Sequence, residues 1–161
     1  MSEYRCKAEA EAAAVDPQLF KATVIEALQR ARVYFMVPEE VRTFVYFREM
    51  PDMDPCADAA VELFDDYLFA EFYFPPTRAL SLPRTWGTVG HEVAHLVPRE
   101  WNEKSRDVER IVRHLDFRKE IEKTTTRLER MWVRDNPFPG EAALRERVEL
   151  MAMEAACDSE P

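Results

Sequence analysis

The sequence predicts an α+β domain in which a small mixed or antiparallel sheet packs on several helices. A helical repeat of apolar residues covers 17–32, and two segments with strand character follow at 41–47 and 67–74. The chain after residue 84 consists mainly of helical patterns. Strands that are grouped in one part of the sequence, with helices before and after them, are typical of α+β domains. A chain of 161 residues can build one hydrophobic core, so we expect a single domain over 1–161.

The N-terminal third contains the first helix and the first strand. Residues 1–15 are rich in Ala and Glu, and we expect a mobile tail there. Asp16 followed by Pro17 predicts a helix start, with an N-cap and then Pro at the first helical position. The alternation of side chains from 41 to 47 predicts a strand.

The segment that leads to the most informative motif contains several short elements. Residues 50–55 hold two prolines and form a predicted loop, and 57–66 is expected to be a short helix. The aromatic-rich run 67–74 predicts a buried strand that ends at Pro75. Residues 78–83 predict a short edge strand, and a peptide could pair with such an edge at 79–82.

The C-terminal half is predicted to be helical. Pro98 should end or kink the helix that precedes it. A long, highly charged helical stretch is expected over 103–134, a loop over 136–140 and a last helix over 141–157.

Composition limits the classes of function. The net charge is −9, which argues against non-specific binding to nucleic acid because such binding needs a basic face. No run of apolar residues approaches the length of about 20 that a membrane span requires. Three cysteines without close spacing, and charges within the first ten residues, favour a reduced, cytoplasmic protein with neither disulfides nor an export signal.

The motif that dominates the sequence is His91-Glu92-Val93-Ala94-His95, an H-E-x-x-H pattern. Histidines four residues apart on a helix lie on one face, so both rings can reach one Zn²⁺. The glutamate beside the first histidine can accept a proton from a water on that metal. Two of the three histidines of the chain belong to this motif, which is otherwise apolar, as expected of a buried helix.

This motif resembles that of the zincin metalloproteases. The resemblance covers residues 78–97 and one helix near the C-terminus, and it implies a zincin-like fold, a Zn²⁺ cofactor and a peptide or protein substrate. The metzincin branch is excluded because Pro98 and Trp101 occupy the positions of its glycine and its third histidine. The remaining likeness is to the gluzincins, in which a glutamate on a later helix completes the site.

Three glutamates compete for the place of the third ligand. Glu154 fits the gluzincin-like pattern E-x-x-x-D, which makes Asp158 the residue that would steady a ligand histidine. Glu149 fits the E-x-x-A pattern of the ImmA/IrrE group, which also resembles this chain in having a threonine at the position of Thr88. Glu103 follows an asparagine in a string similar to that of thermolysin. We rank Glu154 first, and the alternatives remain open.

The sequence therefore predicts a zinc-dependent metallopeptidase with His91 and His95 as metal ligands and Glu92 as the general base. A donor for the oxyanion is also needed, and Tyr67, Tyr73 and His114 are candidates. The alternatives are a zincin-like scaffold that binds metal as a non-catalytic regulatory module, and a structural domain whose histidines bind nothing. The oligomeric state is not predicted.

Overall fold

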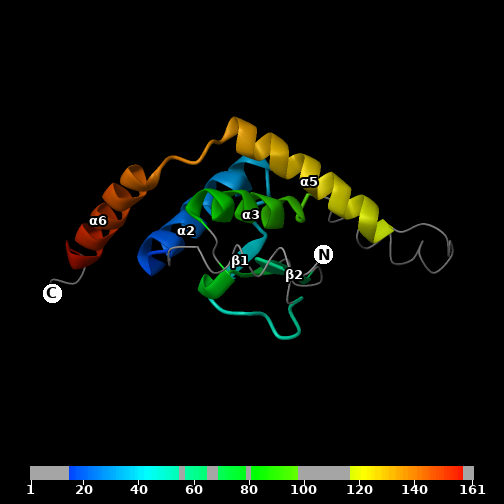
Figure 1. The fold of residues 1–161 in the computed structure, drawn as a ribbon, viewed down its shortest axis with the longest axis horizontal. Helices are drawn as coiled ribbons and strands as arrows, with labels where there is room; N and C mark the ends of the chain where they lie inside the picture. The colour runs from blue at the N-terminus through cyan, green and yellow to red at the C-terminus, as the bar shows by residue number, and fades with distance from the viewer. Residues whose placement is uncertain (1–14, 55–56, 65–68, 79–80, 98–116, 158–161) are drawn as a thin grey trace, which may run out of the picture.

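A computed structural model describes residues 15–54, 57–64, 69–78, 81–97 and 117–157 of the chain. They form a mixed α+β fold: a long helix, three strands and then three further helices (Figure 1). The strands lie on one side of helices α2 and α3, and helices α5 and α6 extend along the other side of the molecule. The predicted α+β class is confirmed.

The first helix, α2 (Pro17–Tyr34), begins where the sequence predicts it. The side chain of Asp16 accepts hydrogen bonds from the backbone N–H groups of Gln18 and Leu19, at 2.8 and 3.4 Å, and Pro17 occupies the first helical position. The apolar face of α2 is fully buried. This helix is therefore a central element of the core.

The sheet consists of β1 (Arg42–Tyr46), β2 (Ala60–Phe64) and β3 (Phe69–Tyr73), in the order β1-β3-β2. β1 and β3 are parallel, whereas β2 and β3 are antiparallel, so the sheet is mixed. The predicted strands at 41–47 and 67–74 are confirmed by β1 and β3. The short helix predicted over 57–66 is wrong, because Ala60–Phe64 forms the strand β2.

Pairing with β3 explains why β2 is a strand. Val61 and Leu63 pack against the core, and Glu62 between them is exposed, as expected of a half-buried strand. The central strand β3 places Ala70 and Phe72 in the core, fully buried. The sheet thus presents one apolar face to the helices, while Phe44, Phe69 and Glu71 lie on its other face, beside a shallow pocket.

The helix with the H-E-x-x-H motif is α3 (Leu82–Ala94). Ser81 caps its start by accepting a hydrogen bond from the N–H of Arg84. The edge strand predicted over 78–83 is wrong: Pro76–Arg78 is a 3-10 turn, α3 already begins at Leu82, and residues 79–80 lie outside the description. Peptide pairing at 79–82 therefore loses its structural basis.

Two helices complete the fold. α5 (Phe117–Asp135) packs on α3, and α6 (Glu141–Cys157) packs on α2. They agree with the later part of the helix predicted over 103–134 and with the helix predicted over 141–157, and no regular element interrupts the loop between them. The earlier part of the charged stretch, Pro98 and the tail at 1–14 fall outside the described residues.

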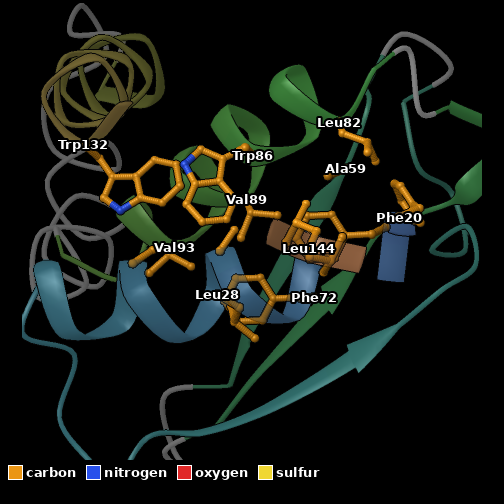
Figure 2. Packing of buried hydrophobic residues seen from close by; sticks show 14 of the residues in the cluster. Phe20, Leu28, Ala59, Phe72, Leu82, Trp86, Val89, Val93, Trp132 and Leu144 are labelled. Carbon is orange, nitrogen blue, oxygen red and sulfur yellow. The ribbon is translucent and has the colours of Figure 1, made fainter. Parts of the chain in front are cut away.

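The core is formed where α2, α3, α5 and β3 meet (Figure 2). Its largest buried side chains are Trp86 of α3 and Trp132 of α5, which stack with ring centroids 5.3 Å apart. Trp132 lies directly over Gly90, where a Cβ atom would stand 2.3 Å from the indole ring. Only glycine allows this approach, so residue 90 determines how closely α5 packs on α3. No helix in the described ranges has the length and apolar character to cross a membrane.

Candidate metal centre

Helix α3 presents its two motif histidines toward α5. His91 lies in the last turn of the helix, and His95 is its C-cap but keeps helical backbone angles, so the four-residue spacing still places both rings on one face. The ring centroids are 4.9 Å apart. The side chains of His91 and His95 are 21% and 16% exposed, so both rings are partly accessible to solvent.

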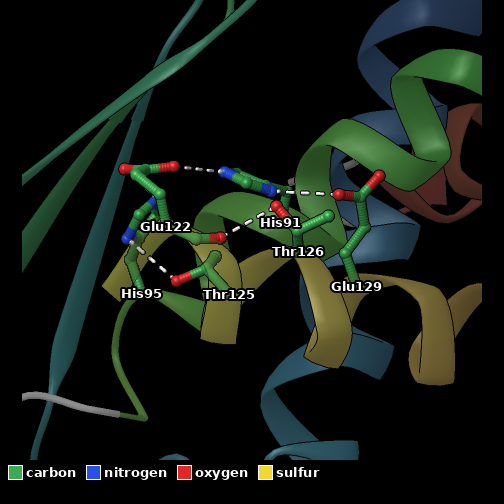
Figure 3. A network of polar contacts seen from close by, with 6 residues as sticks. All are labelled: His91, His95, Glu122, Thr125, Thr126 and Glu129. Atoms are coloured by element: carbon green, nitrogen blue, oxygen red, sulfur yellow. Dashed lines mark hydrogen bonds and ion pairs between the residues drawn. The ribbon is translucent and has the colours of Figure 1, made fainter. Parts of the chain in front are cut away.

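A carboxylate from α5 lies between the two rings. The Oε2 atom of Glu122 is 3.7 Å from Nε2 of His91, and its Oε1 atom is 3.7 Å from Nε2 of His95 (Figure 3). These distances exceed those of direct hydrogen bonds, which are about 2.7–3.2 Å. They are close to the spacing of about 3.4 Å between ligand atoms that share one tetrahedral zinc ion.

The opposite nitrogen of each ring is in contact with a second residue of α5. Nδ1 of His91 lies 3.0 Å from Oε2 of Glu129, and Nδ1 of His95 lies 3.4 Å from the hydroxyl oxygen of Thr125. Contacts of this kind fix the orientation of a metal-binding imidazole and leave Nε2 to face the ion. Both histidines are therefore held with Nε2 toward Glu122.

These three residues fit a metal ion. One nitrogen from His91, one from His95 and one oxygen from Glu122 all lie within 4.8 Å of one another. Two imidazoles and one carboxylate form the donor set of many catalytic zinc sites, which keep a fourth position open for water. Glu122 is 53% exposed, so the site is accessible from solvent on its side. We refer to His91, His95 and Glu122 as the metal centre.

Burial and charge affect the titrating groups differently. Burial raises the pKa of Glu92 to about 7; the charge of His91 opposes this shift, and those of Glu122 and Glu129 reinforce it. Burial lowers the pKa of His95 to about 4 despite the nearby charge of Glu122, so its ring is neutral near pH 7, the form that binds metal. For His91, burial favours a lower pKa, but the hydrogen bond to Glu129 and the surrounding carboxylates outweigh it and the pKa is raised.

The carboxylate of Glu92 belongs to the same region. Its residue is buried, with 8% of its surface exposed, and no described residue donates a hydrogen bond to its carboxylate. Carboxyl groups whose pKa is raised by burial are concentrated at functional sites. This is the residue that the motif predicts as the general base.

The structure brings together only some of the predicted site residues. His91, Glu92 and His95 lie together, whereas Glu149 is exposed on α6, a helix that packs on α2. The side chain of Glu154, together with Asp158 and Glu103, lies outside the described part of the chain. These predictions stay untested.

Of the three predicted oxyanion donors, the structure describes only Tyr73. The hydroxyl group of Tyr73 donates a hydrogen bond to Glu71 on the sheet, at 2.6 Å, and Tyr67 and His114 are outside the description. Tyr73 therefore has a structural partner on β3.

Glu122 was missed by sequence reasoning, as was the role of Glu129. A signal for both was present in the chain. Glu122, Thr125, Glu129 and Trp132 follow one another at intervals of three, four and three residues, so they share one face of a helix. Two acids and a threonine on the same face as a tryptophan indicate a face that is buried but polar in part. Such a face needs polar partners, which the motif histidines supply.

Comparisons with known proteins identify no relative: no family model, no curated protein and no solved structure matches the chain. The zincin resemblance thus depends on the motif residues.

Proposed function

We propose that the protein is a zinc-dependent metallopeptidase in which His91, His95 and Glu122 hold the metal and Glu92 is the general base. The main support is the orientation of the two imidazoles. Both imidazoles turn Nε2 toward the carboxylate of Glu122 on α5. The Nδ1 atom of each ring contacts another residue of α5. A helix that merely happened to contain two histidines would not require this arrangement.

The proposal assigns the place of the third ligand to Glu122 in preference to Glu154. Glu122 comes 27 residues after His95 in the sequence, on the helix that packs directly on α3. Glu154 and Glu149 belong to α6, which packs on α2. A carboxylate already located between the two imidazoles needs no rearrangement of the fold to bind the ion.

The proposed reaction gives each residue of the site a separate role. Zn²⁺ bound at this centre would lower the pKa of a water molecule and polarise the carbonyl group of a peptide bond. Glu92 accepts a proton from the attacking water and transfers it to the leaving amine. Glu129 and Thr125 keep the imidazole rings in the orientation that metal binding needs.

Metal content and turnover test the two parts of this proposal separately. The purified protein should contain about one zinc per chain. The variant Glu122→Ala should lower zinc affinity by more than about 100-fold. This loss exceeds the roughly 10–100-fold that is typical when a residue hydrogen-bonded to a metal ligand is removed. Glu149→Ala, an exposed glutamate on α6, is the matched control and should bind zinc normally.

Two outcomes would change the assignment. If Glu154→Ala loses zinc and Glu122→Ala keeps it, the third ligand is Glu154 and the arrangement on α5 has another role. Turnover is tested with a quenched-fluorescence peptide library. Glu92→Gln should keep zinc and lose cleavage, whereas a zinc-loaded wild-type protein that cleaves no peptide would contradict the peptidase assignment and leave a metal-binding module.

A further inference from the structure

The solvent side of α5 presents a row of positive charges. Five basic residues occur at intervals of four, four, three and four positions: Lys119, Lys123, Arg127, Arg130 and Arg134. At about 100° per residue they fall within about 80° of the helix circumference and extend over about 22 Å. All five are exposed. We call these five residues the basic stripe.

Charge is sorted around this helix. The fully buried Thr125 and Trp132 lie on the side opposite the basic stripe. Glu122 and Glu129 lie on the side that faces the histidines, with Glu122 about 60° from the edge of the stripe. No acidic residue falls inside the sector that the stripe occupies.

The middle of the basic stripe has no counter-ion in the described part of the chain. Arg127 and Arg130 form no ion pair with any described residue, and Arg134 binds its neighbour Asp135 at 2.7 Å. A concentration of positive charge is unexpected in a protein whose net charge is −9. Arg127 and Arg130 therefore do not serve to balance described acids around them.

We infer that the basic stripe is a docking surface for an acidic segment of a polypeptide substrate, located beside the metal centre. The identification of this partner as a substrate rests on the proposed peptidase function. A chain that lies along α5 over Lys123 and Arg127 would pass beside Glu122, which lies about 60° around the helix from the edge of the stripe. Opposite charges along such a surface increase the rate of encounter and select the partner.

The surroundings of the stripe favour a polypeptide over a nucleic acid. Met131 and Val133 are 45% and 40% exposed, and they flank the stripe on its two sides near Arg130 and Arg134. Apolar side chains of this kind suit a peptide that combines acidic and apolar residues. A phosphate backbone would gain little from them, and the net charge of −9 would repel so dense a polyanion.

A binding experiment on the full chain tests this inference. The probe is a fluorescein-labelled peptide of about ten residues in which Glu alternates with Leu and Ser, long enough to extend along the stripe. Binding followed by fluorescence anisotropy should be saturable and should weaken as salt increases. The double variant Arg127→Glu, Arg130→Glu should weaken binding about tenfold, because two attractions become repulsions.

The matched control changes the same amount of charge elsewhere. Lys21 and Arg42 are exposed on α2 and β1, and their joint replacement by Glu should leave binding within about twofold of wild type. Equal losses in the two double variants, no binding of the peptide, or tighter binding of a single-stranded oligonucleotide with the same net charge would each overturn the inference. Stripe-dependent binding without cleavage of any peptide would leave the docking surface in place and contradict the peptidase function, so the two failures are distinguishable.

Discussion

The contact between Gly90 and Trp132 gives the sharpest prediction about this fold. Gly90→Ala adds one methyl group at a point where the ideal Cβ position is 2.3 Å from Cε3 of Trp132 and 2.8 Å from Cδ2 and Cζ3. The indole ring cannot turn aside easily, because it is fully buried and stacked on Trp86. The helix α5 must therefore move away from α3.

The size of the effect follows from these distances. Carbon atoms in contact stand about 3.5–4.0 Å apart, so a gap of 2.3 Å requires a displacement of at least about 1.2 Å. Overpacking of a core typically lowers the free energy of unfolding by about 1–3 kcal/mol. Replacing glycine by alanine inside a helix raises it by about 0.5–1 kcal/mol. We expect a net loss of about 1–2 kcal/mol in the free energy of unfolding. Glu129, one turn from Trp132, should move with the helix and weaken its contact with His91.

Urea denaturation and zinc titration measure the two consequences. The control is Gly87→Ala on the same helix, where the added Cβ would lie 3.6 Å from its nearest neighbours, an ordinary contact. Gly87→Ala should be neutral or should stabilise the protein by up to about 1 kcal/mol and should leave zinc affinity unchanged. Trp132→Leu combined with Gly90→Ala should recover zinc affinity relative to Gly90→Ala alone, because the smaller side chain leaves room for the methyl group.

Unfolding of Gly90→Ala at the same urea concentration as Gly87→Ala would contradict this prediction. That result would mean that α5 adjusts without cost, and that the close approach at residue 90 does not determine the distance between the two helices.

Three further predictions concern single groups. Glu129→Ala should lower zinc affinity by about 10–100-fold through the loss of its contact with His91, as measured by competition with a chelating dye, while Glu122 remains in place. Asp16→Ala should cost about 1 kcal/mol in urea denaturation because two backbone N–H groups at the start of α2 lose their acceptor; an unchanged midpoint would contradict the cap. The hydrogen bond from Tyr73 to Glu71, together with burial, raises the pKa of Tyr73 from 10.0 to about 12. Because the folded-state pKa is the higher one, this group contributes stability below pH 10 that is lost as the pH rises through 12. The variant Tyr73→Phe should remove one step near pH 12 from the tyrosinate absorbance titration.

Elements with strong local signals could be predicted from the sequence. The start of α2 was predictable because an N-cap and a proline are local features. The strand β3 was predictable because aromatic residues favour strands. Ala60–Phe64 was predicted as a helix because its five residues, read alone, do not reveal the partner strand that makes them β2. The strand prediction for the segment before α3 is wrong although a local signal for a helix was present. Ser81 and Pro83 form a start signal for a helix, and the hydrophobic pattern around them favoured a strand.

The residues of the candidate site also differ in whether local sequence or tertiary packing places them. His91, Glu92 and His95 belong to one five-residue motif, so helix geometry alone predicts that they form a site. Glu122 belongs to a helix whose position depends on the burial of Trp132 over Gly90, which is a tertiary contact between residues 42 positions apart. The likeness to the gluzincins favours Glu154, a prediction that stays untested, because a family motif specifies spacing and says nothing of which helix packs on α3.

The packing of α5 on α3 and the metal centre depend on one another. Glu92, Glu122 and Glu129 converge on two imidazoles, and the repulsion between these carboxylates opposes the close approach of the helices. Burial of Trp132, three residues beyond Glu129, favours that approach. A divalent cation bound by the folded state would reduce the repulsion and stabilise it by about 2.7 kcal/mol at a free concentration a hundred times its Kd. By the same linkage, any change that loosens the tryptophan contact should weaken metal binding, although no atom of Trp132 is a ligand.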